Sequence, residues 1–252
     1  MLKRSPWLLL CLYLSLCLVS CAAHLAERKS KAEASRRLGE GYLGEGNATA
    51  ALKELLKAEK LYEKDAFLQN DLGLAYFAKK EFDLAIAHFK KALAIKPDYP
   101  EALNNMGTVY LRLKQWDDAI ECFNRAHANL LYTTPHFALS NLGEAYRGKK
   151  DYRRAIVFYK KALEINPRFP EAHRGLGLTY IATGNYKGAV SSLEKAVQYA
   201  PYLAPAYYDL GRARARQYDT EKAISAFKKV VELVPETPLA KQALAEIRKL
   251  QR

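Results

Sequence analysis

The segment from Asn70 to Pro97, NDLGLAYFAKKEFDLAIAHFKKALAIKP, decides the fold of this chain. Its first half carries Gly73 and Tyr76 three residues apart, and its second half carries Ala85 and Phe89 four residues apart. Both spacings place side chains on one face of an α-helix. The segment therefore predicts two antiparallel helices that approach closely at small residues and end at a proline. Such a hairpin leaves an apolar face uncovered, so it needs neighbours stacked on it.

Copies of this segment recur along the chain. A glycine returns at intervals of 34, 34, 36, 34 and 34 residues, and an alanine follows each glycine by twelve. Six matches at both positions, in a chain of only 13 glycines, identify a true repeat. The glycines are Gly39, Gly73, Gly107, Gly143, Gly177 and Gly211, and the alanines are Ala51, Ala85, Ala119, Ala155, Ala189 and Ala223.

Larger side chains follow the same frame. An aromatic residue comes three positions after five of the glycines, and a bulky residue comes four positions after every alanine. Prolines close four of the repeats. The bulky residues are Leu55, Phe89, Phe123, Tyr159, Leu193 and Phe227, and the prolines are Pro97, Pro167, Pro201 and Pro235.

A 34-residue helix-turn-helix period with this pattern resembles the tetratricopeptide repeat. The resemblance implies an all-α, right-handed superhelical solenoid of six repeats with a C-terminal capping helix. It says little about chemistry, because this scaffold binds proteins and peptides of many kinds. The repeats are expected at about 32–65, 66–99, 100–135, 136–169, 170–203 and 204–236, and the capping helix at 237–250.

The first 20 residues have the features of an export signal. Lys3 and Arg4 form a short basic start, and the apolar run from Trp7 to Val19 is too short for a membrane span of roughly 20 residues. Leu18 to Cys21 resembles a bacterial lipobox, in which the cysteine becomes the lipidated first residue of the mature protein, with palmitate expected among its lipids. An ordinary secretory signal that happens to contain a cysteine is the alternative. With Ala22 rather than aspartate next, the lipobox implies the outer membrane and a domain facing the periplasm.

The mature chain consists of a polar tether at 21–31 and one continuous domain at 32–252. The tether would span at most about 35 Å when extended, which keeps the domain close to its membrane. The net charge of +13 falls to about +11 without the signal. Export argues against nucleic acid as a partner. The lysines are expected to form solvated helix faces, and attraction to a membrane or to an acidic partner is the alternative. Cys122 is expected to be a buried, inert thiol.

Three local features depart from the regular repeat. Asn47 in Asn-Ala-Thr is expected to cap a helix starting near Ala48 rather than to carry a glycan. The interval of 36 predicts either a longer helix or a looser turn between repeats three and four. Arg214 replaces the aromatic of repeat six. The final helix offers four apolar residues to cover that repeat: Leu239, Leu244, Ile247 and Leu250.

No pattern in the sequence indicates an enzyme. The five histidines form no metal-binding spacing, the glycines form no phosphate loop, and no cofactor or small-molecule substrate is expected. Function is instead expected in the groove formed by the first helix of each repeat. Asparagine amides there can hold an extended peptide and arginines can bind its carboxylates. The predicted groove residues are Asn70, Asn104, Asn105, Asn141, Arg147, Arg174, Tyr208 and Arg212. Ser140 and Glu144, which neighbour Asn141 on the first helix of repeat four, are further outward positions.

Taken together, the lipobox, the short tether, six repeats and the long third junction resemble the type IV pilus lipoproteins of the PilF, PilW and Tgl family, the pilotins. The resemblance implies help for the pilus secretin in outer-membrane localisation and multimerisation, with the secretin as protein partner. An outer-membrane lipoprotein adaptor for cell-wall (peptidoglycan) enzymes stays open as an alternative, as does, more remotely, a periplasmic enzyme.

Overall fold

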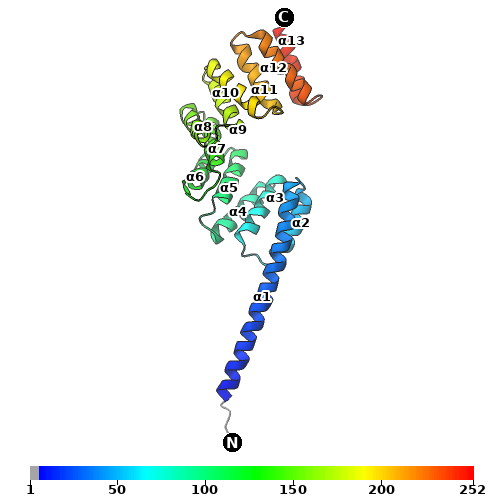
Figure 1. Ribbon diagram of the computed structural model, residues 1–252, viewed down its shortest axis with the longest axis vertical. Coiled ribbons are helices and arrows are strands. Elements are labelled where there is room, and N and C mark those ends of the chain that lie inside the picture. The colour runs from blue at the N-terminus through cyan, green and yellow to red at the C-terminus, as the bar shows by residue number, and fades with distance from the viewer. Residues whose placement is uncertain (1–5) are drawn as a thin grey trace. The chain divides into compact units, whose positions relative to one another are not determined.

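The computed structural model describes residues 6–252, with side chains at residue 20 and residues 22–252. Within that part of the chain it has thirteen α-helices and no strand (Figure 1). The predicted fold class, an all-α stack of helical hairpins, is confirmed. The helices are α1 (Pro6–Gly44), α2 (Ala48–Leu61), α3 (Ala66–Ala78), α4 (Phe82–Ile95), α5 (Pro100–Arg112), α6 (Trp116–Ala128), α7 (Pro135–Gly148), α8 (Tyr152–Ile165), α9 (Pro170–Ala182), α10 (Tyr186–Tyr199), α11 (Ala204–Arg216), α12 (Thr220–Leu233) and α13 (Pro238–Leu250).

Each hairpin turns at one residue of left-handed backbone, seven positions after its signature glycine. Two of these residues are glycines, and the other four carry side chains, which cost energy in this conformation. The amide of the next residue bonds back to the first helix, as from Glu81 N to the Tyr76 carbonyl at 3.0 Å. The turn residues are Gly46, Lys80, Lys114, Lys150, Gly184 and Tyr218.

The signature glycines fit against the bulky residue sixteen positions later. A Cβ added to Gly73 would lie 2.6 Å from the Phe89 ring, and one added to Gly211 would lie 2.7 Å from the Phe227 ring. All six bulky side chains are at most 2% exposed, and so are the six alanines. The sequence frame of glycine, alanine and bulky residue is therefore the contact between the two helices of each hairpin.

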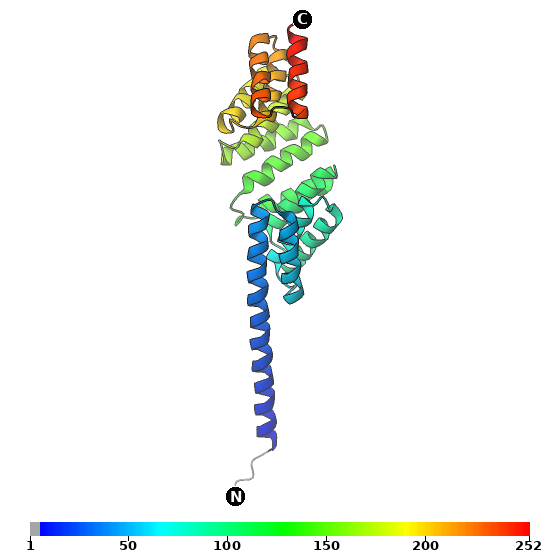
Figure 2. The ribbon, with the colours of Figure 1, turned by 90° about the vertical axis from the view of Figure 1, so that its right-hand side faces the viewer.

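The chain divides into two compact units, Met1–Asn105 and Met106–Arg252. Each unit is described by itself. In the N-terminal unit, Leu55, Leu68 and Leu72 form the core between α1, α2 and α3. The N-terminal part of α1 projects from this core in both views (Figures 1 and 2).

Helix α1 runs without interruption through the predicted tether. Residues 22–31 are therefore helical, and they span about 15 Å at 1.5 Å per residue instead of the 35 Å of an extended chain. Ala32 and Ser35 are the first buried residues among the described side chains of α1. Within the described residues, none of the helices combines the length and the apolarity needed to cross a membrane. Lys3 and Arg4 of the predicted signal, and the side chain of Cys21, lie outside what the structure describes.

In the C-terminal unit, α13 covers the last hairpin. Ala243 and Ile247 join Phe227 and Val230 in one buried cluster, with Leu239 and Leu250 packed at its edge. The prediction was wrong for Leu244, which is 44% exposed. The small residues Ala240 and Ala243 do the close packing instead, so the covering face of α13 is rotated away from Leu244.

Of the two predicted alternatives, a longer helix or a looser turn, the junction between the third and fourth hairpins is the looser turn. Six residues, 129–134, separate α6 from α7, whereas four residues, 166–169, separate α8 from α9. The side-chain oxygen of Asn129 accepts from the Leu131 amide at 2.8 Å, and Tyr132 is buried. Leu130 and Leu131 are 100% and 88% exposed at its tip.

Two smaller predictions are also confirmed. Asn47 caps α2, because its side-chain oxygen accepts from the Ala50 amide at 3.1 Å. Cys122 is buried in α6 at 5% exposure.

Candidate protein-binding groove

Six of the eight predicted groove residues occupy two positions on the first helices, three and two residues before the signature glycine, whereas Arg147 and Arg212 come four residues and one residue after it. Where the structure pairs them, the residue at the first position of one repeat bonds to the residue at the second position of the next. The two partners are 35 residues apart in sequence. We call this set of contacts the inter-repeat ladder, with Arg36–Asp71, Asn70–Asn105 and Arg174–Asp209 as its rungs.

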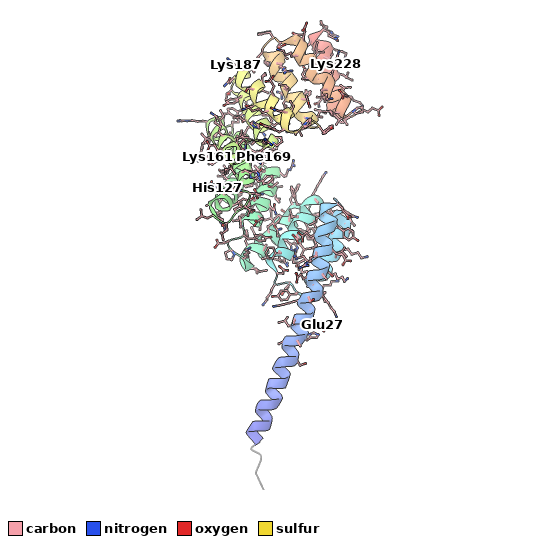
Figure 3. All side chains as sticks on the ribbon, viewed as in Figure 1. Glu27, His127, Lys161, Phe169, Lys187 and Lys228 are labelled. Atoms are coloured by element: carbon pink, nitrogen blue, oxygen red, sulfur yellow. The ribbon has the colours of Figure 1, made fainter. Side chains whose placement is uncertain are left out.

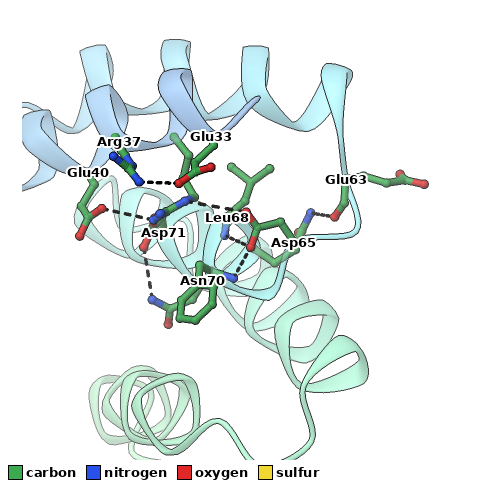
Figure 4. Close-up of polar contacts among 11 residues, drawn as sticks. Glu33, Arg37, Glu40, Glu63, Asp65, Leu68, Asn70 and Asp71 are labelled. Atoms are coloured by element: carbon green, nitrogen blue, oxygen red, sulfur yellow. Dashed lines mark hydrogen bonds and ion pairs between the residues drawn. The ribbon is translucent and has the colours of Figure 1, made fainter. Parts of the chain in front are cut away.

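Two rungs lie in the N-terminal unit (Figure 4). Arg36 Nη1 donates to Asp71 Oδ2 at 3.1 Å, and Asn105 Nδ2 donates to Asn70 Oδ1 at 3.0 Å. Asn70 Nδ2 also donates to Asp71 Oδ1 at 3.4 Å, which joins the rungs. Burial raises the pKa of Asp71 to about 6, although the guanidinium of Arg36 opposes that shift. The ladder here is a continuous polar chain that connects α1, α3 and α5.

These contacts correct the prediction for Asn70. It was expected to point outward, yet it is 5% exposed and both ends of its amide are bonded within the protein. Asn104 and Asn105 are half-buried in the same unit. The predicted line through Asn104, Asn105 and Asn141 involves both units, so it stays a prediction.

The third rung lies in the C-terminal unit. Arg174 Nε donates to Asp209 Oδ2 at 2.8 Å, and Arg212 Nη1 lies 3.5 Å from Asp209 Oδ1. The Asp209 side chain is 5% exposed, whereas those of Arg174 and Arg212 are 35% and 46% exposed. Burial raises the pKa of Asp209, and the two arginines oppose the shift. One buried carboxylate thus orients two arginines that remain open to solvent.

One rung of the C-terminal unit is missing. Its first position is Ser140, and its second position is Gly175, which has no side chain. The side chain of Tyr159 on α8 fills this space. A Cβ added to Gly175 would lie 2.4 Å from the Tyr159 ring and 2.7 Å from its hydroxyl. The hydroxyl is hydrogen-bonded by Arg147, and burial raises the pKa of Tyr159 to about 12. Tyr159 and Gly175 therefore fit together as a pair.

A cavity of about 290 Å³ opens at this missing rung. Phe137 and Phe169 form one wall, with their rings edge to face at 5.1 Å between centroids. Phe169, labelled in Figure 3, is buried at the start of α9, whereas Phe137 is 43% exposed. The cavity brings together three predicted groove residues and two predicted neighbours: Asn141, Arg147, Arg174, Ser140 and Glu144.

A second cavity, of about 410 Å³, lies one repeat further along. Tyr208, Arg212 and Arg216 enter it from α11 at spacings of four residues, and Lys249 enters from α13. Glu246 is the acidic residue of its lining, and it accepts from Lys249 Nζ at 2.7 Å. This end of the groove carries an excess of positive charge.

A third cavity, of about 570 Å³, lies where Arg214 replaces the aromatic residue. Arg214 Nη2 donates to Glu194 at 2.9 Å, and Nη1 donates to the Lys222 carbonyl at 3.3 Å. Both terminal nitrogens of Arg214 are thus bonded within the last two hairpins, whereas its buried Nε has no hydrogen-bond partner among the described residues. This cavity lies between the second helices α10 and α12 and one side of α11, and none of the predicted groove residues lines it.

Metal-binding groups do not converge in the described part of the chain. It contains no group of three or more His, Cys, Asp or Glu side chains that could hold a metal ion. Two of the histidines have structural contacts. His88 Nδ1 lies 2.7 Å from Gln69 Oε1 and His173 Nε2 lies 2.9 Å from the Pro167 carbonyl, and burial lowers the pKa of both.

Comparison with known proteins establishes the family. Three tetratricopeptide-repeat models match residues 73–114, residues 98–168, and residues 146–191 with 180–247, so together they span 73–247. The chain belongs to the tetratricopeptide-repeat family, whose members are typically protein-binding scaffolds without catalytic activity. A comparison with curated protein sequences finds no match.

Solved structures share the fold over most of the chain. PilF of Pseudomonas aeruginosa is 24% identical with a TM-score of 0.74, and the match covers 87% of this chain and 99% of PilF. PilW, a widely conserved type IV pilus biogenesis factor, is 23% identical with a TM-score of 0.77, covering 84% of this chain and 98% of PilW. MamA is 29% identical with a TM-score of 0.55, covering 67% of this chain and 91% of MamA.

The structure also adds residues that the sequence analysis did not single out for the groove. Phe137, Tyr159, Gly175, Arg216 and Lys249 line the two cavities. One signal in the sequence could have found the pair formed by Tyr159 and Gly175. The residue sixteen positions after Leu55, Phe89 and Leu193 is Asp71, Asn105 and Asp209, whereas the residue sixteen after Tyr159 is glycine.

Proposed function

We propose that this protein is a lipid-anchored, protein-binding scaffold that acts as a pilotin for the type IV pilus secretin. The observation that carries the proposal is that the fold of PilF and PilW extends over 98–99% of each of those chains and at least 84% of this one. In this chain six helical hairpins are combined with a segment, Leu18 to Cys21, that resembles a lipobox.

The proposed location is the inner leaflet of the outer membrane, with the helical hairpins in the periplasm. A thioether-linked diacylglycerol and an N-acyl chain on Cys21 together supply more than one lipid signal, which is enough for stable anchoring. The two chemical requirements of the proposal are therefore separate: a lipid on Cys21 and a protein-binding groove on the hairpins.

The anchor is tested by Cys21→Ala. This variant is expected to leave the outer-membrane fraction and to appear as an uncleaved or soluble periplasmic form, because it has no thiol to receive the lipid. Membrane fractionation with immunoblotting measures the change, and Cys122→Ala is the matched control that should stay in the outer membrane. A Cys21→Ala protein that remains firmly in that fraction would contradict the anchor.

The proposed role in secretin assembly is tested by deleting the gene for this protein and measuring heat-stable secretin multimers in isolated outer membranes. The proposal expects loss of the multimers and of pilus-dependent motility, and recovery of both with the wild-type gene. Unchanged multimers in the deletion strain would reject the pilotin role. The cell-wall adaptor would then be tested by co-purification of peptidoglycan enzymes.

A further inference from the structure

The cavity at the missing rung is suited to an apolar side chain. The exposed ring of Phe137 and the buried ring of Phe169 form its wall, and Leu178 and Leu203 also line it. Three of its four charged lining residues have partners nearby, since Arg147 lies 3.8 Å from Glu144 and Arg174 is bonded to Asp209, and the fourth is Glu171. Its 290 Å³ corresponds to roughly ten water volumes, which suits one or two side chains rather than a helix.

The second cavity is suited to carboxylates. Arg212, Arg216 and Lys249 face it against the single acid Glu246. Arg216 is exposed and has no ion-pair partner within the described residues. Arginine forks bind carboxylates through two parallel hydrogen bonds, and the hydroxyl-bearing Tyr208 lies on the same face of α11.

The two cavities lie one repeat apart on the same unit. They share α9, since Leu178 lines the first cavity and Ile181 lines the second. Packed helices lie about 8–10 Å apart, and an extended chain rises about 3.3 Å per residue. About three residues of an extended peptide therefore separate a side chain in the first cavity from one in the second.

We infer that the groove of the C-terminal unit binds an extended segment of the partner protein in which a phenylalanine-like residue lies about three positions from a pair of acidic residues. The aromatic side chain enters the cavity beside Phe137, and the carboxylates bind Arg212, Arg216 and Lys249. This inference deepens the proposed function, on which its partner rests, by defining the chemistry that the partner must present.

The experiment uses the full chain in detergent micelles and fluorescein-labelled, end-blocked peptides, with fluorescence anisotropy as the readout. The parent probe is Phe-Ser-Gly-Glu-Glu, and its reverse, Glu-Glu-Gly-Ser-Phe, tests the direction of the chain. Ala-Ser-Gly-Glu-Glu removes the ring, Phe-Ser-Gly-Gln-Gln removes the charge, and Phe-Glu-Glu removes the spacer. Binding of the parent or its reverse at least tenfold tighter than each of the three altered probes is expected.

Protein variants locate the two sites. Arg216→Ala with Lys249→Ala should weaken the glutamate probe about tenfold and leave the glutamine probe unchanged, because only the former carries charge. Lys228→Ala with Lys187→Ala, two exposed lysines that line neither cavity and are labelled in Figure 3, is the charge-matched control and should have no effect.

Several outcomes would overturn the inference. These are equal binding of the phenylalanine and alanine probes, equal binding of the glutamate and glutamine probes, an equal effect of the control lysine pair, or no binding of any probe at 1 mM. If secretin multimers depend on the gene while these results occur, the pilotin role stands and this groove is not the site. If the probes bind as expected but the multimers do not depend on the gene, the site stands and its partner is another acidic, aromatic segment.

Discussion

The grooves of the two units differ at a single kind of contact. In the N-terminal unit the first helices are joined by successive rungs, and the amide of Asn70 and the carboxylate of Asp71 are used within the protein. In the C-terminal unit the rung between Ser140 and Gly175 is missing, and a cavity opens there. One repeat frame therefore builds a structural ladder where its polar positions are filled and an open cavity where one of them is glycine.

The largest effect is expected at the contact that the two units have in common. Gly73→Ala and Gly211→Ala each place a Cβ within 2.6–2.7 Å of a buried phenylalanine ring, so each should lower the free energy of unfolding by about 1–3 kcal/mol. Gly41→Ala is the control, because nothing lies within 4 Å of its added Cβ, and it should stabilise by up to about 1 kcal/mol through helix propensity. Urea denaturation compares the three; equal effects would contradict the glycine contact.

The next effect concerns the pair that distinguishes the C-terminal unit. Gly175→Asn should destabilise by about 1–3 kcal/mol, since its Cβ meets the Tyr159 ring at 2.4 Å. Adding Tyr159→Phe recreates the combination of Phe89 and Asn105 found in the N-terminal unit, and it should recover part of the loss. The double-mutant cycle gives the coupling energy. Additive effects would show that Tyr159 and Gly175 do not act as a pair.

A smaller effect is expected from the pH dependence of the ladder. Asp71 has a folded-state pKa of about 6 against an ordinary value of 3.8, so the folded protein takes up this proton before the unfolded chain does. Its contribution to stability therefore increases as the pH falls through 6 and is lost as the pH rises. Relative to Asp71→Asn, the wild type should gain about 1 kcal/mol between pH 7 and pH 5 in urea denaturation. A constant difference between the two proteins would contradict the raised pKa.

The smallest effect is expected at an arginine that lies outside the ladder. Arg216→Ala should change the free energy of unfolding by less than about 0.5 kcal/mol, because the side chain is exposed and has no ion-pair partner in the described part of the chain. Thermal unfolding followed by circular dichroism measures this. A loss above about 1 kcal/mol would assign Arg216 to the scaffold rather than to the binding surface.

The fold was predictable because each repeat shows its packing contact directly. Gly73 and Phe89 are sixteen residues apart in sequence and touch within one hairpin, so a fixed spacing reports a fixed contact. The same holds for the helix cap at Asn47, which is a local interaction. Such local contacts can be predicted from the sequence of one hairpin, without knowing how neighbouring repeats pack.

The candidate site was only partly predictable, because its contacts cross between hairpins. Asn70 and Arg174 look like solvated helix positions until the next first helix is placed beside them, 35 residues later. The complementary pairs Arg36 with Asp71 and Arg174 with Asp209 do carry this spacing in the sequence. The cavity at Gly175 depends on an absent side chain, which a search for functional groups does not find.

The continuity of α1 through residues 22–31 has a geometric consequence for insertions and deletions. An extended tether that loses one residue only becomes shorter, but an α-helix that loses one residue also turns everything before that point by about 100° about its axis. Loss of seven residues would restore the angle almost completely, at the cost of about 10 Å of length. The direction that residue 22 faces, relative to the first hairpin, is therefore set by the number of residues between them and not by their identity.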